Sequence, residues 1–105
     1  MKRTSTSPSP DALKRNATRA EGLLKELANA RRLMILCSLT SGEKTVRELA
    51  EASDLSQSAV SQHLSRLREA GMVAADKRGQ SVYYRIQSME AQALISMLYL
   101  MYCKP

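Results

Sequence analysis

The chain has 105 residues, and its 16 Lys and Arg against 10 Asp and Glu give a formal net charge of +6. A chain this short forms one small domain, and its positive charge favours a polyanionic partner such as nucleic acid. Its longest apolar stretch, "AQALISMLYLMYC", is shorter than the roughly 20 residues of a membrane-spanning helix. Two cysteines are too few for the disulfide framework of a small secreted domain. We therefore expect a cytoplasmic protein with no membrane partner.

The first helix is predicted to begin after a short N-terminal arm. Residues 1–8 are rich in Ser, Thr and Pro, which predicts a disordered arm, whereas residues 9–105 are expected to form the folded domain. Ser9 can cap a helix whose first residue is Pro10. Apolar residues then recur at steps of three and four along one narrow face, namely Leu13, Ala17, Ala20, Leu24 and Leu27.

A second helix is expected to begin at Asn29 and to end at Gly42. One face of this helix would carry Leu33, Leu36, Cys37 and Thr40. The apolar and small side chains on that face are expected to point toward the core.

The segment "TVRELAEASDLSQSAVSQHLSRLREAG" predicts two further helices separated by a tight turn. Thr45 and Glu48 have the spacing of a capping box at the start of the first helix, Ser56 can cap the second, and Gly71 is expected to end it. The inward faces would carry Val46, Leu49 and Ala50, then Val60, Leu64 and Leu67. A short helix, a turn and a longer helix form a helix-turn-helix.

The remainder of the chain predicts a β-hairpin and a last helix. "MVAADKRGQSVYYRI" contains two strands around "KRGQ", with Gly79 in the turn, and such a hairpin after a helix-turn-helix is a wing. Ser88 can cap the last helix, which is apolar on most of its circumference. We expect a second copy of the chain to cover it. The predicted fold is mainly α with a small β-hairpin wing, a winged helix-turn-helix.

The outward face of the second motif helix carries hydroxyl and amide side chains. These side chains can both donate and accept, as the reading of base edges in a major groove requires, and they are Gln57, Ser58, Ser61, Gln62 and Ser65. Basic side chains are expected to contact phosphates, namely Arg66, Arg68, Lys77, Arg78 and Arg85. Arg78, at the hairpin tip, could enter a minor groove. An ordinary solvated surface is the alternative, but the basic hairpin and the net charge favour double-stranded DNA.

Three segments in order, "LANARRLMILCSL", "TVRELAEASDLSQSAVSQHLSRLREAGMV" and "RGQSVYYRI", resemble the ArsR/SmtB family of winged-helix repressors. The resemblance extends from about residue 21 to residue 103. It implies a homodimer, formed through the first and last helices, that binds operator DNA and releases it when an inducer binds or modifies ligand residues. It also places His63, in "SQHL", within the DNA-reading unit.

The metal-sensing members of this family have a thiol-rich site that would fall at "VRELAEA", where this chain has no thiol. A site of nitrogen and sulfur ligands would have Cys37, Cys103 and little else, so we predict neither a metal site nor a cofactor. A thiophilic metalloid, As(III), remains an alternative inducer. A thiol enzyme is a remote alternative, because it would need a base and a substrate pocket as well.

The two cysteines resemble the paired thiols of the persulfide-sensing branch of the family. That resemblance implies that reactive sulfur species link Cys37 to Cys103 and thereby release DNA. General redox sensing of peroxide or disulfide stress is an alternative, and so is a structural role for Cys37 with an incidental Cys103. Because an apolar setting raises a thiol pKa, we expect Cys103, beside Lys104, to attack first and Cys37 to resolve.

Overall fold

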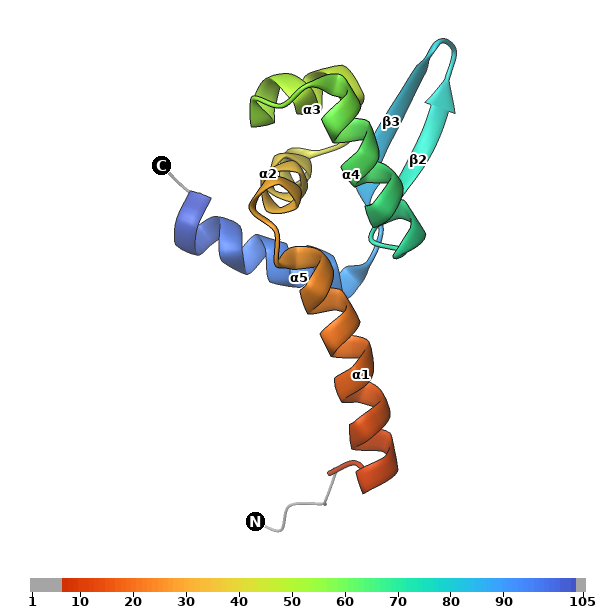
Figure 1. The fold of residues 1–105 in the computed structure, drawn as a ribbon, viewed down its shortest axis with the longest axis vertical. Coiled ribbons are helices and arrows are strands. Elements are labelled where there is room, and N and C mark those ends of the chain that lie inside the picture. The colour runs from red at the N-terminus through yellow and green to blue at the C-terminus, as the bar shows by residue number, and fades with distance from the viewer. Residues whose placement is uncertain (1–6, 104–105) are drawn as a thin grey trace.

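The computed structural model describes residues 7–103, and its elements follow the order expected of a winged helix-turn-helix (Figure 1). Of the predicted arm, residues 1–6 lie outside the described residues, and Ser7 and Pro8 are exposed and without regular secondary structure. Helix α1 (Pro10–Leu27) begins as predicted, because the Ser9 hydroxyl accepts a hydrogen bond from the Ala12 amide at 3.2 Å. Most of α1 projects from the rest of the molecule, and its Leu27 is buried where it meets α2.

Helix α2 (Ala30–Ser38) lies at the centre of the molecule. Asn29 caps it through a hydrogen bond from the Arg32 amide to Oδ1 at 3.0 Å, which confirms the predicted start. The helix ends four residues before Gly42, and a 3₁₀ turn, η1 (Leu39–Ser41), fills the interval. Ile35 and Leu36 have no exposed surface, so the core face includes Ile35 as well as the predicted Leu36. Helix α2 contacts α3 (Val46–Ser53) and α5 (Met89–Leu98), so it links the middle of the chain to its C-terminal part.

Helices α3 (Val46–Ser53) and α4 (Gln57–Glu69) form the predicted helix-turn-helix. Thr45 and Glu48 make the full capping box, and Ser56 caps α4 by accepting a hydrogen bond from the Ala59 amide at 3.1 Å. Asp54 adopts a left-handed conformation with φ 56°, which turns the chain between the helices. The inward side chains Leu49, Ala50, Val60, Leu64 and Leu67 are buried as predicted.

The wing is an antiparallel hairpin of β2 (Val73–Arg78) and β3 (Ser81–Ile86). Gly79, with φ 59°, provides the turn, because a left-handed backbone costs glycine no steric penalty. A two-residue strand, β1 (Lys44–Thr45), pairs with β3 and gives the sheet the order β1-β3-β2. The sequence pattern does not predict β1, since two residues are too few to show an alternation of apolar and polar side chains.

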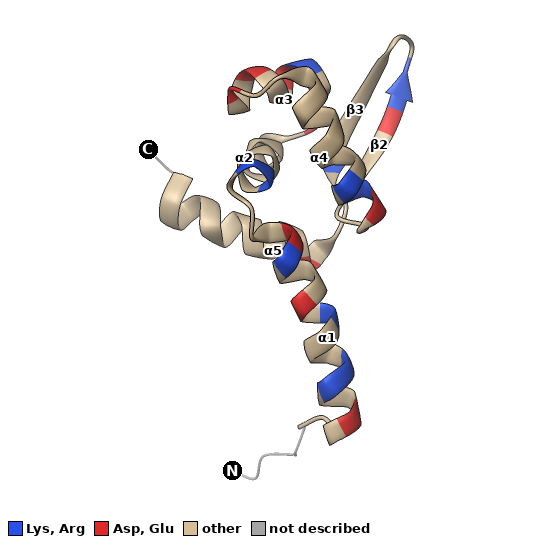
Figure 2. Ribbon diagram, viewed as in Figure 1, with Lys and Arg blue, Asp and Glu red and all other residues tan. Residues whose placement is uncertain are grey.

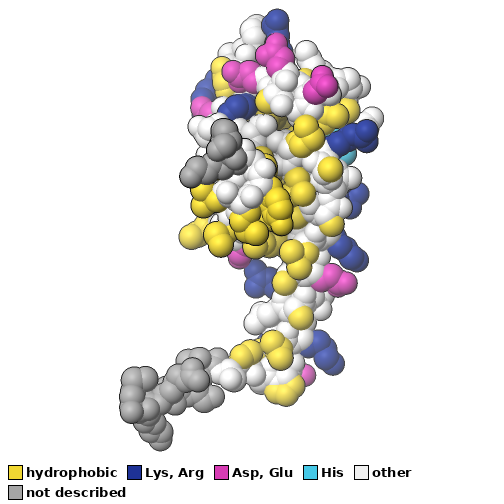
Figure 3. All heavy atoms as spheres, turned by 90° about the vertical axis from the view of Figure 1, so that its left-hand side faces the viewer, with side chains coloured by type: hydrophobic (Ala, Val, Ile, Leu, Met, Phe, Trp, Pro, Cys, Tyr) yellow, Lys and Arg dark blue, Asp and Glu magenta, His cyan; other side chains and the backbone are white. Residues whose placement is uncertain are grey.

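The last helix, α5 (Met89–Leu98), is capped by Ser88 as predicted and continues as a π-helical segment, η2 (Tyr99–Cys103). Ala91 and Ile95 are buried against the core, while large apolar side chains on the other faces are exposed. Figure 3 shows hydrophobic side chains gathered on this face of the molecule, next to the C-terminal end of α1. The architecture confirms the predicted fold class, winged helix-turn-helix.

Candidate nucleic-acid interface and thiol site

The exposed face of α4 is polar, and its carboxylate, Glu69, is the last residue of the helix. Burial of Val60, Leu64 and Leu67 points the opposite side of the helix to solvent, and the side chains predicted to read bases lie on that side. They are exposed as a group: Gln57, Ser58, Ser61, Gln62 and Ser65. Over residues 57–65 this face therefore offers hydroxyl and amide groups without negative charges that would repel phosphates.

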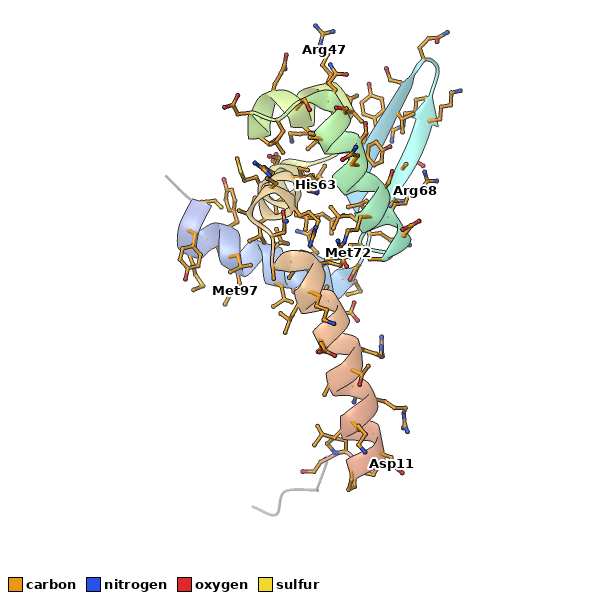
Figure 4. All side chains as sticks on the ribbon, viewed as in Figure 1. Asp11, Arg47, His63, Arg68, Met72 and Met97 are labelled. Carbon is orange, nitrogen blue, oxygen red and sulfur yellow. The ribbon has the colours of Figure 1, made fainter. Side chains whose placement is uncertain are left out.

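His63 lies on the flank of α4 that faces α2, not on its outward side (Figure 4). The pKa of its imidazole is lowered by burial first and then by the nearby charges of Arg32, Arg31 and Arg66. The imidazole is therefore neutral at physiological pH. Its assignment as a DNA contact stays a prediction.

Arg66 is exposed at the C-terminal half of α4, but its guanidinium is already paired within the chain. Its Nε donates a hydrogen bond to Glu26 Oε1 of α1 at 2.8 Å, and this bond raises the pKa of Arg66. The buried Arg32 of α2 lies beside the same carboxylate and donates from Nε to the Glu26 carbonyl at 2.7 Å. Glu26 thus joins the first helix to α2 and α4.

The wing presents basic side chains at its tip, where Figure 2 shows Lys and Arg beside a carboxylate on β2. Lys77 and Arg78 are exposed. Arg78 donates hydrogen bonds to both carboxylate oxygens of Glu43, and its guanidinium lies over the Tyr83 ring. The bonds from Arg78 are the main cause of the lowered pKa of the Glu43 carboxyl. Arg78 therefore lies at the predicted place, with a carboxylate partner that was not predicted.

The two cysteines, far apart in sequence, lie in contact. Cys37 is in the last turn of α2 and Cys103 ends η2, and the Cys103 thiol lies 3.4 Å from Cys37 Sγ. A disulfide has an S–S length of about 2.05 Å, and both residues are free thiols here. Tertiary packing therefore brings together the pair that the sequence analysis singled out.

The two thiols differ in exposure, as expected. Cys103 is exposed, while Cys37 is half-buried and packs against the core. Burial, the hydrogen bond with Cys103 and the charge that Cys103 would carry as a thiolate together raise the pKa of Cys37 to about 12, and burial is the largest of these causes. Cys37 is thus protonated at neutral pH. Lys104, which was expected to assist Cys103, lies outside the described residues.

Sequence reasoning missed Glu26 and Glu43, the carboxylates that pair with predicted DNA contacts. Glu26 is 40 positions from Arg66, and Glu43 is 35 positions from Arg78. Neither pair has a local sequence signal, because an ion pair at this separation depends on how the helices and strands pack. Any phosphate that binds Arg66 or Arg78 would therefore compete with a carboxylate of the same chain.

The family described as "Bacterial regulatory protein, arsR family" matches residues 29–75. The transcriptional activator HlyU of Vibrio cholerae is 46% identical to this chain over 92 residues, which cover 88% of this chain and 85% of HlyU. The chain belongs to the ArsR family.

Solved structures of similar proteins agree with this ArsR-family fold. Reduced HlyU from Vibrio cholerae has a TM-score of 0.84 at 45% identity, covering 89% of this chain and 98% of that chain. The transcriptional repressor BigR from Xylella fastidiosa has a TM-score of 0.80 at 32% identity, and the match covers 93% of this chain and 100% of that chain. A homodimeric winged helix-turn-helix DNA-binding domain, Mb0332 from Mycobacterium bovis, has a TM-score of 0.73 at 28% identity, and the match covers 93% of this chain and 89% of that chain.

This ArsR-family chain is therefore a DNA-binding transcriptional regulator of the winged-helix type and not an enzyme. Within residues 7–103, no three side chains among His, Cys, Asp and Glu gather closely enough to hold a metal ion. Across the same described part of the chain, no helix combines the length and apolarity needed to cross a bilayer.

Proposed function

We propose that this regulator is a repressor that binds operator DNA as a reduced homodimer and releases it when reactive sulfur species link Cys37 to Cys103. The observation that carries the proposal is the 3.4 Å contact between the two sulfur atoms. Because Cys103 is exposed, core packing does not account for this contact. A contact between a half-buried and an exposed thiol is what a two-step thiol switch requires.

DNA binding would use α4 and the wing. The uncharged polar side chains of residues 57–65 on α4, led by Gln62, would enter the major groove, while Lys77 and Arg78 would contact the backbone or the minor groove. Arg66 would reach a phosphate on leaving Glu26. Such a division between base reading and phosphate contacts is usual in protein–DNA interfaces.

Dimerisation would cover the apolar face of the first and last helices. Between Ala91 and Cys103 the chain has no charged residue, and 59% of the Met97 surface and 59% of the Leu100 surface are exposed. Leu13 and Leu24 of α1 are exposed to a similar extent. A contiguous apolar surface of this kind on a small domain favours a protein partner, and the similar Mb0332 domain is homodimeric.

The chemistry would begin at the exposed thiol. The Cys103 thiolate attacks the terminal sulfur of a persulfide, RSSH, forming Cys103–S–SH and releasing the thiolate RS⁻. Cys37 then loses its proton to water, its thiolate attacks the inner sulfur, Cys103 Sγ, and HS⁻ leaves as the disulfide forms. The two protein thiols are oxidised by two electrons and the transferred sulfur is reduced to sulfide. Retention of one sulfur in the bridge would consume a second persulfide.

A link between these residues would restrain α2 relative to η2. Helix α2 packs against α3 of the helix-turn-helix and against α5. A direct disulfide requires the sulfur atoms to approach from 3.4 Å to about 2.05 Å, so the cysteine side chains or the helix ends that carry them must move. A displacement between the DNA-binding and dimerisation helices would alter the spacing of the two α4 helices, which must meet the groove about one turn of DNA apart.

The test uses Cys37→Ser and Cys103→Ser with intact-mass analysis and operator binding. Both variants should bind DNA like the reduced wild type and should not release it on persulfide treatment, because neither can form the bridge. Cys37→Ser should accumulate sulfur on Cys103, whereas Cys103→Ser should react slowly. The wild type should form a bridged product and lose at least tenfold in affinity, about 1.4 kcal/mol. Ser38→Ala, beside Cys37 on α2, is the matched control and should respond like the wild type.

The same assay separates the inducers. Parallel treatment with hydrogen peroxide and with arsenite tests the redox and metalloid alternatives, and release by persulfide alone supports the proposal. Full release of DNA from either cysteine variant would contradict a bridge and favour simple modification of the remaining thiol. Transcription from an operator-bearing promoter should rise on release, and a fall would show an activator instead.

The raised pKa of Cys37 adds a pH test. Cys103→Ser removes the contributions of Cys103 but keeps the burial of Cys37, the largest cause of its raised pKa, so alkylation of the remaining thiol should continue to accelerate with pH from about 7 to 9. A rate that levels off within this range would show that Cys37 ionises at a lower pH than its burial implies.

A further inference from the structure

The tip of the wing holds a charge cluster beyond the proposed DNA contacts. The Arg78 guanidinium donates from Nη1 to Glu43 Oε1 and from Nη2 to Glu43 Oε2, the latter at 2.8 Å. Its Nη2 also lies 3.5 Å from Asp76 Oδ2, and its Cζ lies 4.9 Å from the centre of the Tyr83 ring. One edge of the guanidinium is thus bound to a carboxylate, and one face is covered by an aromatic ring.

The occupied edge is one that Arg78 needs for DNA. Arginine binds phosphates most strongly through two parallel N–H groups, and Glu43 occupies both terminal nitrogens in that way. Glu43 precedes β1, and the Arg78 and Glu43 side chains are 51% and 36% exposed, so DNA can reach the pair. To use this edge on DNA, Arg78 must leave Glu43.

We propose that Glu43 is an internal competitor of DNA for Arg78, so that the exposed ion pair between the two side chains lowers the affinity of the regulator for DNA. The inference rests on the proposed DNA contact of Arg78. On arbitrary DNA the exchange gains little, because one exposed ion pair replaces another. On the operator, Arg78 gains minor-groove contacts as well, since a narrow minor groove attracts arginine. The exchange is therefore favoured where the groove suits the wing.

The experiment compares the full chain and four variants on two duplexes. The variants are Glu43→Gln, Arg78→Ala, the double variant, and Glu51→Gln. Glu51 is exposed on α3, and Glu51→Gln removes the same negative charge as Glu43→Gln, so it is the matched control. One duplex is the tightest binder that the wild type selects from a random-sequence pool, and the other is a shuffled duplex of equal composition. Affinities are measured over a salt series, and thermal melting checks that each variant is folded.

Glu43→Gln should bind the selected duplex up to about fivefold more tightly, the upper range for one exposed ion pair, because Arg78 no longer has to leave a carboxylate. It should bind the shuffled duplex more tightly by at most the same factor, since on that duplex the wild type can keep Arg78 on Glu43. Glu51→Gln should change both duplexes by the same small factor. In the Arg78→Ala background, Glu43→Gln should do no more than Glu51→Gln does, because the carboxylate then has no arginine to hold.

Other outcomes overturn the inference in recognisable ways. The same gain in the Arg78→Ala background would show a general effect of lost negative charge. Weaker binding of the selected duplex by Glu43→Gln would show that Glu43 orients Arg78 for DNA, and unchanged binding of both duplexes would show no competition. If Arg78→Ala alone alters neither duplex, the proposed DNA contact of Arg78 is wrong, and the inference is overturned with it.

Discussion

The helix-turn-helix and the α5–η2 segment differ in how fully they bury their apolar side chains. Leu49, Val60 and Leu67 have no exposed surface, whereas Met97 and Met101 are 59% and 63% exposed. Figure 4 shows Met97 on the side of α5 away from α2. The DNA-binding half is thus complete within one chain, while the last helix leaves an apolar surface for another polypeptide. The thiol pair joins α2, at the centre of the core, to the end of that last helix.

The largest expected effect is on stability and comes from the buried core of the helix-turn-helix. Leu64→Ala should lower the free energy of unfolding by about 2–5 kcal/mol, because it leaves a cavity beneath α4 where Leu64 is 1% exposed. Ser61→Ala, on the exposed side of the same helix, should change it by no more than about 0.5 kcal/mol. Urea unfolding at several protein concentrations measures both. Equal effects would contradict the assignment of the two faces of α4.

The second prediction concerns the exposed apolar surface of α5 and the dimer that it is proposed to form. Met97→Glu should raise the dimer dissociation constant by about 30- to 100-fold, roughly 2–3 kcal/mol, because it places an unpaired charge in the proposed interface. Analytical ultracentrifugation measures the mass, and far-ultraviolet circular dichroism should show unchanged helix content. Glu90→Gln, an exposed change in the first turn of the same helix, is the control. A Met97→Glu protein that remains dimeric at low concentration would place the interface elsewhere.

A smaller effect is expected at the outward face of α4. Gln62→Ala should weaken operator binding by about 1–3 kcal/mol and should barely change binding to random DNA, since an amide can make a bidentate contact with one base. Binding titrations on both duplexes at equal salt concentration measure the difference. Equal losses on both would show that Gln62 does not read sequence, and the base-reading role would then pass to Gln57 or the serines.

Much of the fold could be predicted because its signals are local. Ser9, Asn29, Thr45, Ser56 and Ser88 each cap a helix at the position that the sequence indicates. A cap depends on one side chain and an amide two or three residues away, so it can be recognised without tertiary structure. The inward positions of α4 were predictable for a similar reason, since apolar spacing along a helix defines a face.

Other features had no local signal. The two-residue strand β1 exists because β3 lies beside it, and the π-helical turn of η2 interrupts a pattern that predicts a continuing α-helix. The carboxylate partners of Arg66 and Arg78 come from distant segments. The place of His63 on the flank of α4 that faces α2 likewise depends on packing, and its assignment as a DNA contact stays a prediction.

The sequence by itself determined the order of the helices, the caps that begin them, the wing turn at Gly79 and the polar face of α4. These depend on residues within one or two helical turns of each other, where backbone geometry sets the neighbours. Only the tertiary structure decided that Arg78 pairs with Glu43, that Arg66 pairs with Glu26, and that Cys103 contacts Cys37 across 66 positions. Contacts at such separations form when the core fixes how helices and strands pack, and that packing depends on all the core side chains together.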